Sequence, residues 1–158
     1  MEKLTLVFAG DFPEGHRRLA EEMGLSGVIK GLGHLPHNEV LRLTKSADLL
    51  LAINYEGFST LISGKIYEYW ALGGPSILLL SCRGAAQELL DQRGLGITVS
   101  RDDVPAIEQA ILTIYHRYAA GSPMKISNVG IEEFDRKILS KRLAQTLSSV
   151  SPDTGGKP

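Results

Sequence analysis

The chain has 158 residues, of which 43% are hydrophobic and 22% charged, so it is long enough for one domain with a sizeable core. Its formal net charge of -1 gives no electrostatic reason to expect nucleic acid or an anionic membrane as a partner. The single cysteine, Cys82, excludes an internal disulfide, and the apolar runs are too short to cross a bilayer. The N-terminus lacks a signal-peptide pattern, so we expect a cytoplasmic protein without a membrane-spanning segment.

Strand and helix signals alternate along the chain. Short apolar runs predict strands at 4–9, 28–31, 48–55, 76–80 and 96–100. Amphipathic or capped segments predict helices at 14–23, 37–47, 65–72, 84–92, 104–118 and 131–150. We expect one domain over residues 1–150 and a disordered tail at 151–158, which is polar and rich in glycine and proline.

This alternation predicts an α/β fold of the doubly wound kind, with a mostly parallel sheet and helices on both faces. Ligands of such sheets bind beyond the carboxyl ends of the strands. The loops that end strands at that edge are 10–15, 31–38, 54–65 and 81–84. These loops are therefore the places to look for a site.

The first of these loops does not match a dinucleotide-binding turn. Its sequence, Gly-Asp-Phe-Pro-Glu-Gly, lacks the G-x-G-x-x-G spacing and places acidic residues where a pyrophosphate would need bare backbone. We interpret it as a tight turn from strand to helix.

The second loop contains glycines that permit close approach of a ligand. Its main chain from Gly33 through His34 to Leu35 could contact the edge of a nucleotide base. The alternative is a helix start in which His37 or Asn38 caps the first amides, and the residues alone leave both hypotheses open. No Cys or His partner stands at ligand spacing from the histidines, so no metal site is predicted.

The segment Ser63–Pro75 predicts a short helix that is stopped by glycine and proline and followed by a buried strand. A helix N-terminus attracts anions, and here Ser63, Gly64 and Lys65 add a hydroxyl, free amides and a positive charge. Glu68 lies on the same face and could accept two hydrogen bonds from a vicinal diol such as a ribose. The alternative is an exposed Lys–Glu pair within the helix, worth about 0.2–0.5 kcal/mol. The predicted place of the helix at the ligand-binding edge favours the site.

Several segments follow one another as in a known family. They are Leu6–Gly10, Gly33–Glu39, Ser46–Leu51 and, most specifically, Gly64–Pro75. This order resembles the C-terminal, nucleotide-sugar-binding domain of retaining glycosyltransferases with the GT-B fold, the family 4-like group. The resemblance spans about residues 4–120. It implies a Rossmann-like domain whose substrate is a nucleoside diphosphate sugar, with no separate cofactor.

The resemblance also implies roles for individual residues. Glu68 matches the second glutamate of the family's paired-glutamate motif, which binds the ribose hydroxyls. Lys65 and the amides of Ser63 and Gly64 would face the diphosphate. The stretch Gly33–Pro36, which includes His34 and Leu35, would lie near the base. No catalytic residue is assigned.

Two departures from the family pattern affect the expected activity. Thr60 stands where the first glutamate of the motif is expected, and Glu56 is off register, which puts direct contact with the donor sugar in doubt. The acceptor-binding N-terminal domain and the opening strand and helix of the C-terminal domain are absent. We therefore expect a fragment that binds nucleotide weakly and is inactive alone. Its parent enzyme would transfer a hexosyl unit to an unknown acceptor in polysaccharide biosynthesis.

Two other functions remain open. A nucleotide-sugar epimerase of the same fold would need a further acid or base in the cleft, for which His34 and His37 are the nearby candidates. A non-catalytic interaction module would instead use Tyr55, Phe58 and Trp70 in an interface. The sequence does not indicate the oligomeric state.

Overall fold

A computed structural model describes residues 4–54, 57 and 59–150 of the chain. The chain divides into two compact units, residues 1–47 and residues 48–158, and the described strands form a separate sheet in each. The single domain over residues 1–150 remains a prediction, and the expected tail at 151–158 lies outside the described residues.

The first unit is a small βαβα arrangement. Its elements are β1 (Leu6–Phe8), α1 (Glu14–Glu22), β2 (Ile29–Gly31) and α2 (His37–Ser46). The two strands are parallel, with Leu6 opposite Ile29 and Phe8 opposite Gly31. The Phe8 and Phe12 rings stack with their centroids 4.8 Å apart, and Ala20 of α1 is buried. A parallel pair needs a crossover connection, and α1 supplies it.

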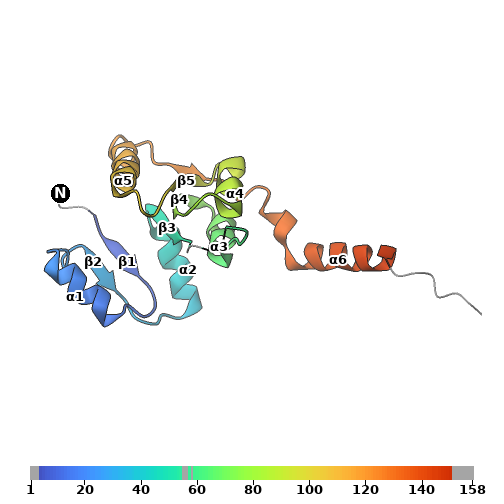
Figure 1. Cartoon of the computed structure of the whole chain (residues 1–158), viewed down its shortest axis with the longest axis horizontal. Helices are drawn as coiled ribbons and strands as arrows, with labels where there is room; N and C mark the ends of the chain where they lie inside the picture. Colours follow the sequence, from blue (N-terminus) through green and yellow to red (C-terminus); the bar gives the residue numbers. More distant parts are fainter. Residues whose placement is uncertain (1–3, 55–56, 58, 151–158) are drawn as a thin grey trace, which may run out of the picture. The chain divides into compact units, whose positions relative to one another are not determined.

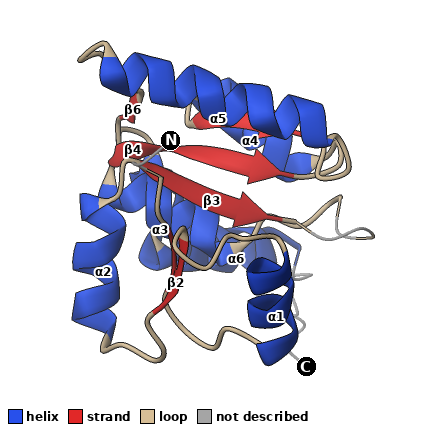
Figure 2. Ribbon diagram, turned by 90° about the vertical axis from the view of Figure 1, so that its left-hand side faces the viewer, coloured by secondary structure: helices blue, strands red, loops and turns tan. Residues whose placement is uncertain are grey.

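The second unit contains the larger sheet. Its elements are β3 (Leu49–Ile53), α3 (Gly64–Leu72), β4 (Gly74–Leu80), α4 (Ala85–Arg93), β5 (Gly96–Val99), α5 (Val104–Ala119), β6 (Lys125–Ile126), the 3₁₀ turn η1 (Ile131–Phe134) and α6 (Arg136–Val150). Strands β3, β4 and β5 are parallel neighbours in that order, and β6 pairs antiparallel with the start of β4. Figure 2 shows the arrows of β3 and β4 running in the same direction.

The core of the second unit is built around β4, because this strand has neighbours on both sides. Ile77, Leu78 and Leu79 are at most 2% exposed. The continuous apolar run is what a central parallel strand requires. At the start of β5, a Cβ on Gly96 would collide with the Ile77 carbonyl oxygen, so only glycine allows the two strands to approach here.

Helices cover both faces of this sheet. α3 packs against β3, and α4 and α5 pack against β5. Figure 1 shows α5 on one side of the strands, with α3 and α4 on the other. This arrangement confirms the predicted fold class, an α/β chain in which helices alternate with parallel strands.

Two predicted boundaries are wrong, and one short strand was not predicted. The helix predicted at 131–150 is two pieces, because Asp135 has non-helical dihedral angles and its carboxylate accepts a hydrogen bond from the Lys137 amide at 2.7 Å. Pro75 does not separate helix from strand but lies within β4, where it faces Lys125 of β6. The two-residue strand β6 was not predicted, because Lys125 and Ile126 are too few to show a period.

Of the helices in the described part of the chain, none combines the length and the apolar character that a bilayer crossing requires.

Candidate functional site

The N-terminus of α3 is formed by a capped helix start. Ser63 is the N-cap, and its Oγ accepts a hydrogen bond from the Lys65 amide at 3.3 Å while its carbonyl accepts one from the Ile66 amide at 3.0 Å. Ser, Thr, Asn and Asp favour this position because their side chains satisfy an otherwise unpaired amide. The preceding loop leaves the carboxyl end of β3, so the positive end of the α3 dipole lies at that end of the strand.

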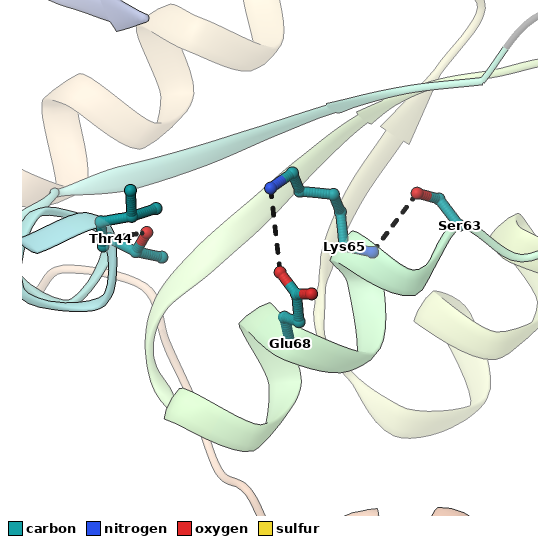
Figure 3. A network of polar contacts seen from close by, with 5 residues as sticks. Thr44, Ser63, Lys65 and Glu68 are labelled. Carbon is teal, nitrogen blue, oxygen red and sulfur yellow. Dashed lines mark hydrogen bonds and ion pairs between the residues drawn. The ribbon is translucent and has the colours of Figure 1, made fainter. Parts of the chain in front are cut away.

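Lys65 and Glu68 lie side by side on the exposed face of α3 (Figure 3). The Lys65 Nζ and Glu68 Oε2 atoms are 3.8 Å apart, and the two side chains are 61% and 58% exposed. An ion pair this exposed contributes little to stability. Both groups remain accessible, so a ligand could replace their mutual contact with its own anion and hydroxyl groups. The geometry fits an exposed intrahelical pair and a ligand site equally well.

The opposite face of α3 is buried. Ile66 and Trp70 are fully buried, and Tyr67 and Tyr69 are partly covered. Burial raises the pKa of Tyr67. Burial also raises the pKa of Tyr69, with a smaller contribution from the negative charge of Glu68. Gly64, Lys65, Glu68 and Ala71 are exposed, so the charged pair is the main accessible chemical feature of α3.

The predicted base-binding residues lie in the first unit. Gly33 has a positive φ of 66°, and its carbonyl accepts a hydrogen bond from the Gly10 amide at 2.8 Å. His34 Nδ1 lies 3.3 Å from an Asp11 carboxylate oxygen, with both side chains more than 80% exposed. Leu35 is half-buried. Gly33, His34 and Leu35 therefore form one short, mostly exposed turn after β2.

The alternative for this turn, a helix capped by His37 or Asn38, is wrong. Both residues lie inside the first turn of α2, whose N-cap is Pro36 and has no side-chain cap. The Pro36 carbonyl accepts hydrogen bonds from the Glu39 and Val40 amides at 2.9 and 3.1 Å. Contact between this turn and a base remains a prediction.

The structure thus brings Ser63, Gly64, Lys65 and Glu68 together at the start of one helix in the second unit. It groups Gly33, His34 and Leu35 in the first unit. Whether the two groups share a cleft stays a prediction. Thr60, at the place of the expected first glutamate, lies in an exposed turn.

Four further residues were named in the sequence analysis, three of them for the interaction-module alternative and one, Glu56, as a glutamate near the motif. Glu56, Tyr55 and Phe58 lie outside the described residues. Trp70 is fully buried, so it is not available for the interface of the interaction-module alternative. Within the described ranges, no three His, Cys, Asp or Glu side chains gather closely enough to hold a metal ion.

Two contacts near the site were missed from sequence. The Ser59 carbonyl accepts a hydrogen bond from the Ala85 amide at 2.7 Å and so ties the loop before α3 to the start of α4. A Cβ on Gly84 would collide with the same carbonyl, and this is why glycine precedes α4. The pairing of Asp11 with His34 was also missed. Both contacts join residues far apart in the sequence, and the sequence indicated neither of them except through the glycine at position 84.

Comparison with known proteins identifies the family to which the chain belongs. The family model described as "Glycosyl transferases group 1" matches residues 1–117, which is about three quarters of the chain. The chain belongs to the group 1 glycosyltransferases. A search of curated proteins and a search of solved structures each gave no match. The matched range contains every predicted site residue and ends within α5, so it stops before β6, η1 and α6.

Membership in this family supports sugar transfer as the general activity. It agrees with the Rossmann-like alternation of helices and parallel strands in both units.

Proposed function

We propose that this group 1 glycosyltransferase chain is the C-terminal, donor-binding domain of a retaining, family 4-like enzyme with the GT-B fold. Its substrate would be a nucleoside diphosphate sugar, and the parent enzyme, a cytoplasmic protein, would transfer the hexosyl unit to an acceptor in polysaccharide biosynthesis. In this proposal a separate domain of the parent enzyme would bind the acceptor, so we expect the chain alone to transfer no sugar.

One observation carries the proposal. At the carboxyl end of β3, a capped helix N-terminus presents Lys65 and Glu68 side by side and exposed. The helix end and the Lys65 ammonium suit a diphosphate, since both favour negative charge. The Glu68 carboxylate suits the two ribose hydroxyls, since it can accept a hydrogen bond from each.

The same groups explain what the protein would do in the transfer reaction. Cleavage of the bond between sugar and diphosphate leaves growing negative charge on the leaving group. Lys65 and the α3 amides would stabilise that charge, and Glu68 would orient the nucleotide. The turn Gly33–Leu35 would lie near the base, and no metal or cofactor is required in this scheme.

Nuclear magnetic resonance titration of the chain with UDP and GDP tests the site. We expect amide shifts at Gly33, Gly64, Lys65 and Glu68. If the chemical shifts of these amides do not change while those of another region do, the assigned nucleotide site is wrong.

A further inference from the structure

The 3₁₀ turn η1 packs against the buried side of α3. The Phe134 ring lies 4.9 Å from the Tyr67 ring and 5.6 Å from the Trp70 ring, measured between centroids. Tyr67 and Trp70 are three residues apart and so share one face of α3. Both pairs are tilted, at 43° and 58°, which is a favourable arrangement for aromatic rings. A residue more than sixty positions away in the chain therefore covers the helix that carries Lys65 and Glu68.

A second set of contacts fastens the same turn. The Arg93 guanidinium lies 5.4 Å from the centroid of the Trp70 ring, and its Nη2 lies 3.0 Å from an oxygen of Glu133. Arg93 therefore links the end of α4 to both α3 and η1. Gly130 has a φ of 91°, and a Cβ there would lie 3.0 Å from Arg93 Nη1 and 3.4 Å from Trp70, so larger residues would crowd this junction.

These contacts hold one face of α3. α3 has nine residues, and an isolated helix of that length is marginal in water. The Trp70 indole nitrogen is buried without a hydrogen-bond acceptor in the described part of the chain, so no hydrogen bond from this side chain fixes the helix. Packing of its buried face therefore sets the direction in which Lys65 and Glu68 point: α3 contacts β3 and buries Ile66 and Trp70, and Phe134 of η1 covers Tyr67 and Trp70.

We propose that Phe134 is a positioning residue for nucleotide binding: through Tyr67 and Trp70 it holds α3 so that Lys65 and Glu68 face the ligand together. This inference rests on the proposed function. It assigns a role to a segment that lies beyond the range matched by the family model. Phe134 itself touches neither Lys65 nor Glu68 in this scheme and acts only through the helix.

The test compares the wild-type chain with three variants. Phe134→Ala removes the ring, Phe134→Tyr keeps it, and Val129→Ala shortens an exposed apolar side chain of the same segment as a control. For each, Kd for UDP and for GDP is measured from amide shifts at a temperature where urea titration shows the protein to be folded. Emission of Trp70, the single tryptophan, reports the environment of the α3 face independently.

We expect Phe134→Ala to raise Kd about tenfold, the equivalent of one charge-assisted hydrogen bond, and to move the Lys65 and Glu68 amide signals before nucleotide is added. Phe134→Tyr and Val129→Ala should bind as the wild type does. If Phe134→Ala lowers stability but binds with unchanged Kd, Phe134 has only a structural role and the inference is wrong. If Phe134→Ala does not fold, Phe134→Leu takes its place, with the same criterion for Kd.

The two proposals fail in different ways. A wild-type chain whose α3 amides do not respond to UDP or GDP overturns the nucleotide site and, with it, the positioning role. A wild-type chain that responds at α3, together with a Phe134→Ala variant of equal affinity, overturns the positioning role alone.

Discussion

Lys65 and Glu68 should contribute to different parts of nucleotide binding, although they contact each other in the free protein. Glu68→Gln keeps one acceptor but loses the charge, so we expect UDP to bind about fivefold more weakly and inorganic pyrophosphate to bind equally well. Lys65→Met should weaken both ligands, because both carry the diphosphate charge. Isothermal titration calorimetry of UDP and pyrophosphate measures these differences.

A matched control is Lys141→Met, which removes an exposed lysine from α6. It should leave both affinities unchanged. Neither Lys65→Met nor Glu68→Gln should alter the free energy of unfolding by more than about 0.5 kcal/mol, since the pair is exposed. Equal losses of UDP and pyrophosphate affinity in Glu68→Gln would contradict the assignment of Glu68 to the ribose.

The partly buried tyrosines of α3 predict a loss of stability at high pH. Burial raises the pKa of Tyr67 and of Tyr69 in the folded state above the ordinary value of 10.0, so the unfolded chain loses these protons first. Their stabilising contribution is complete below pH 10 and declines as the pH rises from about 10 through the folded pKa values. Urea titrations at pH 8, 10 and 11 measure the decline, and the double variant Tyr67→Phe, Tyr69→Phe should show less of it. An equal decline in that variant would assign the effect to other groups.

Individual residues were predictable from sequence where their roles are local. The Ser63 cap and the spacing of Lys65 and Glu68 depend on residues within one helical turn, and both are present in the structure. The contact of Phe134 with Tyr67 and Trp70 was not predictable, because it depends on how a distant turn folds back. The cover of Trp70 by η1 and Arg93 was not predictable for the same reason, since both are distant in the sequence from α3.

At the level of elements, the start of α4 should be intolerant of any side chain at position 84. Gly84→Ala would place a Cβ against the Ser59 carbonyl and break its hydrogen bond with the Ala85 amide, so we expect a loss of about 1–3 kcal/mol in unfolding free energy. Gly64→Ala is the matched control, because a Cβ at the first residue of α3 meets open space. It should be neutral or stabilising by about 0.5 kcal/mol, since alanine favours helix more than glycine does.

Urea titration of both variants measures the difference between the two glycines. A Gly84→Ala variant as stable as the wild type would show that the loop before α3 is not held by α4.

The elements themselves were predictable because each carries a pattern over several residues. The apolar runs of β3, β4 and β5 and the Asp103 cap of α5, whose carboxylate accepts a hydrogen bond from the Ala106 amide at 3.0 Å, all follow from local sequence. β6 was missed because two residues carry no pattern, and the break at Asp135 was missed because apolar residues continue on both sides of it. Short elements and breaks depend on tertiary contacts that a local pattern does not contain.

At the level of the whole molecule, the alternation of strands and helices predicted parallel pairing, but it did not predict that the described strands form two separate sheets. The described strands form two sheets, one in each unit, and nothing in the apolar runs of β1 and β3 distinguishes strands of one sheet from strands of two. The predicted site has residues in both units, so a complete donor site over Gly33–Leu35 and Lys65–Glu68 remains a prediction.

The whole chain should bind nucleotide without transferring sugar. Holding donor and acceptor together in the right geometry accounts for a large part of the rate of such reactions, with effective molarities of about 10⁵–10⁸ M in favourable cases. In this proposal, Lys65 and the α3 N-terminus would stabilise the leaving diphosphate, while the acceptor would be held by another domain. We therefore expect weak binding of UDP or GDP by the isolated chain and no sugar transfer. Incubation with radiolabelled UDP-glucose and GDP-mannose, followed by product separation, measures turnover, and the Lys65→Met variant serves as the blank. Turnover that the wild-type chain shows and Lys65→Met lacks would mean that this chain holds both substrates itself, which would overturn the proposed division of labour while leaving the nucleotide site in place.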